Sequence, residues 1–256
     1  MTNIDKARAF AALHVPGSPV ILFNVWDAGS AKAVEDAGAK ALATGSWSVA
    51  AAHGYRDAEE LPLDLAVANG ARIAAATELP VSLDFEGGYS VEPGRLAENF
   101  ALVLAAGIIG CNFEDRVVGG EGLQPVDAQA RRIEALRRAA ERSGVPAFIN
   151  ARTDIFLSTK AESHDRAAAD HALERARAYA EAGASGFFVP GLVDEGLIAR
   201  ICELSPLPVN AMAFPGLPAP ARLAELGVAR ISHGPGPYRQ AMKALTDAAR
   251  ATLGAG

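Results

Sequence analysis

The feature that most constrains the fold is a regular alternation of short apolar runs and helix-forming stretches along the 256 residues. The stretches between the runs are rich in Ala, Glu and Arg, and their apolar side chains recur with the period of about 3.6 residues that is typical of amphipathic helices. We expect strands at the eight runs 20–24, 41–46, 81–86, 110–114, 147–152, 186–190, 209–212 and 229–232.

The residues that lead into these runs alternate between two kinds. A proline, which can start a strand without donating a ladder hydrogen bond, precedes the first, third, fifth and seventh runs. A glycine that can end a helix in the left-handed conformation precedes the other four. Eight units of this kind predict a (β/α)8 TIM barrel in a single domain over residues 1–256. The absence of a Gly-x-Gly-x-x-Gly motif after any strand disfavours an open Rossmann-type sheet.

Composition narrows the possible partners and the cellular location. The formal net charge is −6 and no basic block occurs, which disfavours nucleic acids and anionic membranes as partners. Cys111 and Cys202 lie in a strand-like and a helix-like stretch, so we expect two buried thiols rather than a disulfide. No apolar run approaches the roughly 18 residues of a membrane span, and no secretory signal is recognisable, so a cytoplasmic protein is expected.

Acidic residues gather at the carboxyl ends of the expected strands, where barrels of this kind place their active sites. Asp84 and Glu86 lie two residues apart and would share one face of a continuing strand, and Glu114 ends the next strand. A set of carboxylates without His or Cys suits Mg²⁺, or Mn²⁺, better than Zn²⁺. We predict a divalent metal site formed by these three acids. For each acid alone, a solvated strand end is the alternative.

Arg152 is the only cation among these expected strand ends. It is a candidate to bind a substrate carboxylate or phosphonate, and the alternative is a structural ion pair with Asp154 or Glu114. The tripeptide Gly45-Ser46-Trp47 could offer backbone N–H groups to an anion. No lysine occupies a strand end and no Gly-x-Ser-x-Gly motif occurs, which disfavours Schiff-base and acyl-transfer chemistry.

Two loops and one histidine complete the set of candidates. Residues 116–124 contain three glycines and form either a mobile lid or a passive surface loop. Residues 47–61 read as a polar loop over the barrel mouth, and Asp57 within it could handle a proton. His233 follows the last expected strand and could act in acid–base chemistry, or could be a structural hydrogen-bonded histidine.

Taken together, these segments resemble the isocitrate lyase/phosphoenolpyruvate mutase superfamily over nearly the whole chain. The matching pieces are Phe-Asn-Val-Trp-Asp at 23–27, Asp57, Asp-Phe-Glu-Gly-Gly-Tyr at 84–89, Asn-Phe-Glu-Asp at 112–115, Ile-Asn-Ala-Arg-Thr-Asp at 149–154, Asn210 and Phe-Pro-Gly at 214–216.

The resemblance implies roles for these positions. Asp84, Glu86 and Glu114 would hold Mg²⁺ partly through water, and Asp57 would lie near the metal and the substrate. Arg152 would bind the substrate anion. The implied substrate-binding residues are Trp26, Gly45, Ser46, Trp47, Arg152 and Asn210. Similar proteins are homo-oligomers, typically tetramers with a dimer as the alternative, that exchange the C-terminal helix, expected here over 237–253, between subunits.

Two departures from the family pattern bear on the reaction. Glu86 stands where the family usually has Asp, and residues 118–122 read Val-Gly-Gly-Glu-Gly where carbon–carbon lyases carry Lys-Lys-Cys-Gly-His or a close variant. We therefore expect a Mg²⁺-dependent enzyme that cleaves a small 2-oxo dicarboxylate, by oxaloacetate-like decarboxylation or C–C hydrolysis, through an enolate stabilised by the metal. The candidate catalytic residues are Asp57, Arg152 and His233.

Three other functions remain open. They are a phosphonopyruvate-type P–C hydrolase or mutase, a methylisocitrate-type lyase, and a barrel that binds a 2-oxo acid such as 2-oxoglutarate without turning it over. All four readings share a small 2-oxo acid as substrate, product or bound ligand.

Overall fold

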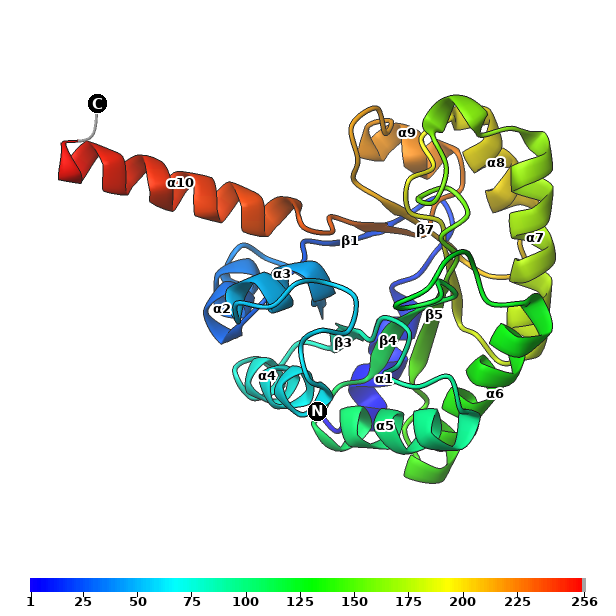
Figure 1. Cartoon of the computed structure of the whole chain (residues 1–256), viewed down its shortest axis with the longest axis horizontal. Helices are drawn as coiled ribbons and strands as arrows, with labels where there is room; N and C mark the ends of the chain where they lie inside the picture. Colours follow the sequence, from blue (N-terminus) through cyan, green and yellow to red (C-terminus); the bar gives the residue numbers. More distant parts are fainter. Residues whose placement is uncertain (255–256) are drawn as a thin grey trace.

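The computed structural model describes residues 1–254 and shows eight parallel strands that alternate with helices around a nearly closed barrel (Figure 1). This confirms the predicted (β/α)8 fold. Every strand lies within its expected run, although most are shorter. The strands are β1 Val20–Leu22, β2 Leu42–Ala43, β3 Val81–Asp84, β4 Gly110–Glu114, β5 Phe148–Arg152, β6 Gly186–Phe188, β7 Val209–Met212 and β8 Arg230–Ser232.

The ring of strands closes differently between β1 and β2 than elsewhere. The strands pair in the order β1-β8-β7-β6-β5-β4-β3-β2, and a single backbone bridge from Val25 to Thr44 joins the two ends. The buried Asn24 side chain reinforces this seam. Its Nδ2 donates to the Thr44 carbonyl at 2.8 Å, and its Oδ1 accepts the backbone N–H groups of His233 and Gly234 at 2.8 and 2.9 Å.

The helices follow the predicted periodicity. The four glycines expected to end helices, before β2, β4, β6 and β8, have φ values from 89° to 94°. One expectation was wrong, because the stretch 47–61 is not loop throughout and begins within a helix. The helices are α1 Asn3–Ala12, α2 Ala28–Asp36, α3 Ser46–Ala52, α4 Leu63–Ala75, α5 Pro93–Ala105, α6 Val126–Ser143, α7 Arg166–Glu181, α8 Glu195–Leu204, α9 Pro220–Glu225 and α10 Gly236–Leu253, with a 3₁₀ turn over Ala161–Ser163.

The amino end of the barrel contains buried polar groups that the sequence did not indicate. His14, just after α1, stacks on Phe148 at the start of β5 with ring centroids 4.0 Å apart. Arg230 is fully buried inside the barrel, donating from Nε to Ser232 Oγ at 3.1 Å and from an Nη atom to Asn112 Oδ1 at 3.0 Å. Burial, together with the charge of Arg230, lowers the pKa of His14 to about 3.

The outer face of β1 and the last helix both leave apolar side chains uncovered. α10 extends away from the barrel, and its Leu245 is 63% exposed (Figure 1). Ile21 and Phe23 are 47% and 39% exposed and, with Val34, line an apolar groove of about 820 Å³. Across residues 1–254, no helix is long and apolar enough to span a membrane.

The two cysteines are both free, as expected. Cys111 is buried in β4, whereas Cys202 in α8 is only partly buried, so the expectation of two buried thiols was right for Cys111 alone.

Candidate active site

A cavity of about 160 Å³ opens at the carboxyl ends of the strands, where the sequence placed the site. Six of the predicted residues line it: Gly45, Ser46, Trp47, Asp57, Asp84 and Arg152. Five others are not among its lining residues: Trp26, Glu86, Glu114, Asn210 and His233.

Asp84 is the acid with a free coordination position in this cavity. Its Oδ2 accepts the backbone N–H of Ser46 at 2.9 Å, and its backbone N–H donates to Thr44 Oγ1 at 2.9 Å. Its Oδ1 is buried and has no hydrogen-bond partner within the described chain. The Ser46 N–H that was expected to bind a ligand anion is therefore already used by Asp84. Because buried carboxylate oxygens normally have a partner, Asp84 Oδ1 is fitted to accept a cation or a water molecule.

Glu86 does not share a strand face with Asp84, so that expectation was wrong. β3 ends at Asp84, and Glu86 lies in the following turn with a φ of 50°. The alternation of side chains holds only while a strand continues. Burial and the charges of Asp84 and Asp57 raise the pKa of Glu86 to about 9.

The turn after β3 and the segment that carries Asp57 hold each other through reciprocal hydrogen bonds. Glu59 donates its backbone N–H to Glu86 Oε2 at 2.9 Å, and Glu59 Oε1 accepts the backbone N–H of Tyr89 at 2.8 Å. The four non-glycine residues with positive φ in the described chain all belong to these two segments: Ala58, Glu59, Glu86 and Tyr89. Such strained conformations persist only where the surroundings impose them, so this contact fixes Asp57 beside β3.

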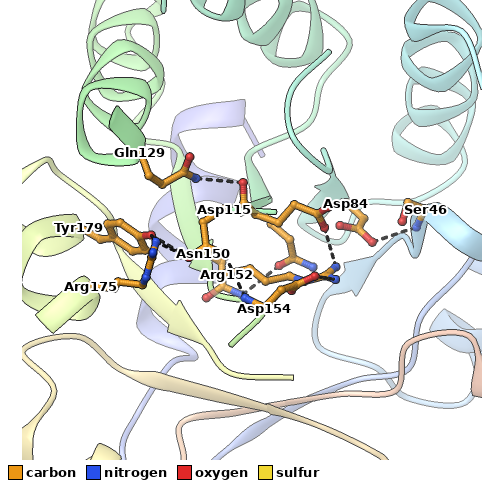
Figure 2. Close-up of polar contacts among 11 residues, drawn as sticks. Ser46, Asp84, Asp115, Gln129, Asn150, Arg152, Asp154, Arg175 and Tyr179 are labelled. Atoms are coloured by element: carbon orange, nitrogen blue, oxygen red, sulfur yellow. Dashed lines mark hydrogen bonds and ion pairs between the residues drawn. The ribbon is translucent and has the colours of Figure 1, made fainter. Parts of the chain in front are cut away.

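Arg152, at the end of β5, is enclosed by carboxylates. It donates to both oxygens of Asp154, from Nε at 2.6 Å and from an Nη atom at 2.9 Å, and its other Nη atom lies 2.9 Å from Glu114 Oε2. Figure 2 shows Arg152 and Asp154 beside each other, with Ser46 and Asp84 at one side of the cluster. The ion pair considered as the alternative for Arg152 is thus present. Its predicted role toward a substrate stays a prediction.

The acids around the cavity outnumber Arg152, the one arginine of the described chain that pairs with them. Partial burial of its carboxyl group and the nearby Asp84 raise the pKa of Asp57, although other parts of this residue are exposed. Burial raises the pKa of Glu114 more than the adjacent Arg152 lowers it. A cluster of carboxyl groups with raised pKa values is one that a bound cation would stabilise.

The donor set fits a cation that keeps much of its water. Within residues 1–254, no three side chains of His, Cys, Asp or Glu are grouped so that they could hold a metal ion by themselves. Mg²⁺ does not require such a group, because it usually binds through one or two carboxylates and several waters. Asp84 Oδ1 is a buried carboxylate oxygen without a partner in the described chain, whereas Glu86 and Glu114 are not among the lining residues of the cavity.

The remaining predicted residues lie around the cavity rather than on its surface. Asn210 donates to Ser232 Oγ at 3.1 Å inside the barrel, and Trp26 packs edge-on against Tyr238 with centroids 5.1 Å apart. Burial lowers the pKa of His233, whose ring lies 5.1 Å from that of Phe23.

Asp115 follows Glu114 but faces a different environment. Its Oδ2 accepts hydrogen bonds from Arg175 at 3.0 Å and from the Tyr179 hydroxyl at 2.8 Å, and its Oδ1 accepts the Asp154 backbone N–H at 3.0 Å (Figure 2). Asp115 is fully buried and therefore structural.

Several lining residues were not predicted. Asn24 and Ser232 lie at or just beyond strand ends, a position that could have identified them. Leu157, Phe188 and Met212 are apolar lining residues, in addition to Trp47 and Pro235. Leu157 lies in the segment after β5, where no sequence pattern distinguishes it.

The acidic cluster, with one paired arginine, lies at the carboxyl ends of the barrel strands, where enzymes of this fold carry their active sites. Residues 10–253 match the family model of phosphoenolpyruvate phosphomutase. The chain therefore belongs to this family, within the isocitrate lyase/phosphoenolpyruvate mutase superfamily of lyases, hydrolases and mutases. This confirms the resemblance inferred from the motifs.

Known proteins are similar over almost the full length. The solved structure of a candidate phosphonomutase from Burkholderia cenocepacia J2315 is 54% identical, with a TM-score of 0.95, and the match covers 98% of this chain and 99% of that one. An uncharacterised protein of Mycobacterium tuberculosis is 36% identical over 95% of this chain and 88% of its own length. An oxaloacetate decarboxylase of Pseudomonas savastanoi pv. phaseolicola is 28% identical over 96% of this chain and 84% of its own length.

Proposed function

We propose that this protein is a Mg²⁺-dependent enzyme that cleaves a small 2-oxo dicarboxylate, with oxaloacetate-like decarboxylation as the reaction. The observation that carries this proposal is the buried, unpartnered Asp84 Oδ1 in a cavity of about 160 Å³ that also contains Asp57 and Arg152. Similarity to an oxaloacetate decarboxylase over 96% of the chain supports it.

Asp84 would hold the cation directly, and Glu86 and Glu114 would hold it through water. Bound Mg²⁺ would supply Lewis-acid stabilisation of negative charge that develops on the keto oxygen of the substrate. Asp57 lines the cavity together with Asp84, so it is placed to transfer a proton to C3 after the bond breaks. Arg152 would orient the substrate through its remaining hydrogen-bonding capacity. His233, next to the seam, is the second candidate for handling the proton.

The 116–124 loop supports decarboxylation over lysine- or cysteine-dependent cleavage. Its ends approach through a bridge between Arg116 and Leu123, and Val118 lies close to Gly87 in the turn after β3. The loop contains no Lys or Cys, and Glu121 is its only acidic residue. Chemistry of the methylisocitrate-lyase type would need the cysteine that carbon–carbon lyases of the family carry here, and this loop does not contain it.

We also propose that α10 packs on a second copy of the chain. The apolar groove outside β1 and the exposed leucines of α10 belong to the same chain, and in this structure α10 extends away from the barrel (Figure 1). Exchange of this helix would bury both surfaces in a homo-oligomer, a dimer or a tetramer.

Pyruvate release from oxaloacetate tests the enzymatic proposal. Because Mg²⁺ alone promotes this reaction, the rate should be compared with that of an equal concentration of the Asp84→Asn protein at the same Mg²⁺ concentration. We expect the unmodified protein to exceed that control by at least about a hundredfold, the scale of losing an electrostatic contribution to catalysis. Equal rates would sink the proposal.

A further inference from the structure

We propose that Leu157, Phe188 and Met212 form the subsite for the C3 substituent of the substrate, and that this subsite takes a group that departs without charge. The inference rests on the proposed function and narrows its substrate class. It predicts a C3 carboxylate that leaves as CO2, and it argues against a phosphonate or a distal carboxylate that stays on the ligand.

The order of the strands places this apolar wall opposite the acids. Phe188 ends β6 and Met212 ends β7, whereas Asp84 ends β3 and Asp57 lies in the segment after β2. In a ring of eight strands in the observed order, β6 lies opposite β2 and β7 lies opposite β3. A 2-oxo acid whose carboxylate and keto oxygens face Asp84 would therefore extend its C3 substituent toward Phe188 and Met212.

No cationic side chain without a carboxylate partner lines the cavity beside this apolar wall. Among the described residues that line the cavity, Arg152 is the only Lys, Arg or His. Each of its three guanidinium nitrogens already has a carboxylate partner, from Asp154 or Glu114. With two carboxylates for one guanidinium, a further anion retained against Phe188 and Met212 would be desolvated without compensation, which is costly.

The same environment favours loss of CO2. A C3 carboxylate in contact with apolar side chains loses hydration that its neutral product does not need. When the C3–C4 bond breaks, its electron pair moves to C3 and the keto oxygen, and CO2 leaves. A proton from Asp57 to C3 then gives pyruvate, so atoms and charge balance. The cavity of about 160 Å³ has room for a small acid.

Calorimetric titration of the full chain with Mg²⁺ present tests the subsite without relying on turnover. The ligands are oxalate, 2-oxobutyrate with a neutral C3 substituent, 2-oxoglutarate with a retained carboxylate, and phosphonopyruvate. We expect 2-oxobutyrate to bind at least about tenfold more tightly than 2-oxoglutarate or phosphonopyruvate, because the last two place an anion against the wall. If 2-oxoglutarate or phosphonopyruvate bound as tightly as 2-oxobutyrate, or more tightly, the proposal would be overturned.

Met212→Lys and its neutral control Met212→Leu provide the second arm. A lysine on the wall should strengthen 2-oxoglutarate binding by about tenfold relative to oxalate, and Met212→Leu should leave that ratio unchanged. An unchanged ratio in a folded Met212→Lys protein, with folding checked by circular dichroism, would also overturn the subsite.

These results are separable from the proposed function. If the ligand order holds but oxaloacetate is not decarboxylated, the enzymatic proposal fails and the subsite stands. If oxaloacetate is decarboxylated but 2-oxoglutarate binds as well as 2-oxobutyrate, the subsite fails and the enzymatic proposal stands.

Discussion

Arg152 and Asp154, two residues apart in the chain, form a two-point ion pair with donor–acceptor distances of 2.6 and 2.9 Å. Pairs of this geometry are strong and directional. Asp154 is 1% exposed, so almost none of its charge is screened by water. Asp154 therefore determines how much of the charge of Arg152 is available to a ligand.

Replacing Asp154 should leave the guanidinium of Arg152 freer to pair with an anionic ligand. We expect Asp154→Asn to strengthen 2-oxoglutarate binding by about three- to tenfold, and to lower the free energy of unfolding by about 2–3 kcal/mol because a charge-assisted bond is weakened. Calorimetric titration and urea denaturation measure the two effects. Asp170→Asn, which removes a surface partner of Arg200, is the matched control and should change neither by much. Unchanged 2-oxoglutarate affinity in folded Asp154→Asn protein would contradict the prediction.

Asp84→Asn should separate ligand binding from stability. Loss of its charge is expected to weaken Mg²⁺-dependent oxalate binding by at least about a hundredfold, because the directly coordinating carboxylate is removed. The melting temperature without Mg²⁺ should stay level or rise, since Asp84 raises the pKa of both Asp57 and Glu86 by charge repulsion. Calorimetry and thermal unfolding provide the readouts, with the exposed Asp64→Asn as control. A lower melting temperature together with intact oxalate binding would instead mark Asp84 as structural.

His14 should contribute an acid-dependent loss of stability. The pKa of His14 in the folded protein is about 3, below the ordinary 6.5, so the unfolded chain takes up the proton first as the pH falls. Stability from this group is complete above pH 6.5 and is lost progressively toward pH 3. Between about pH 7 and pH 4.5 the loss is about 2.5 kcal/mol. Urea denaturation at both pH values should show a smaller loss for His14→Gln, and equal losses in both proteins would refute the assignment.

The uncovered surfaces should govern assembly. Ile21→Glu in the groove, or Leu245→Glu on α10, places a charge where apolar burial is proposed, and either should reduce the oligomer to smaller species. Light scattering coupled to size-exclusion chromatography measures the mass. Val91→Glu alters a residue that is 64% exposed but outside the groove, and it should leave the mass unchanged. A wild-type protein that runs as a monomer would end the proposal.

The barrel could be predicted from the sequence because the residues that mark the strand starts act on the backbone locally. A proline or a helix-ending glycine marks each strand start, and the glycines adopt the left-handed conformation that their position requires. The strand ends were harder to predict. Glu86 was placed on a strand because the Asp-x-Glu spacing fits alternation, but β3 stops two residues earlier and Gly87 and Gly88 continue a turn.

Contacts between distant segments explain what sequence reasoning missed. Arg230 lies at the start of β8 and pairs with Asn112 from β4, and no local pattern predicts that these two residues meet. For Arg152, the sequence offered an ion pair with Asp154 or Glu114 as the alternative, and both pairs form because the sheet register brings Glu114 opposite Arg152. The apolar wall was missed for the same reason, because Leu157, Phe188 and Met212 meet only once the ring of strands has closed.

Asn24 takes part both in closing the barrel between β1 and β2 and in lining the cavity. One side-chain amide joins β1 to the Thr44 carbonyl and to the backbone after β8, and Asn24, Ser46 and Gly234 all border the cavity. A ligand bound between these edges would bridge the β1 and β2 sides of the barrel, where a single backbone bridge joins the two ends of the sheet. The cavity therefore borders the most weakly paired part of the strand ring. A ligand bound in it should slow amide hydrogen exchange along β1 and β2 more than along β5 and β6.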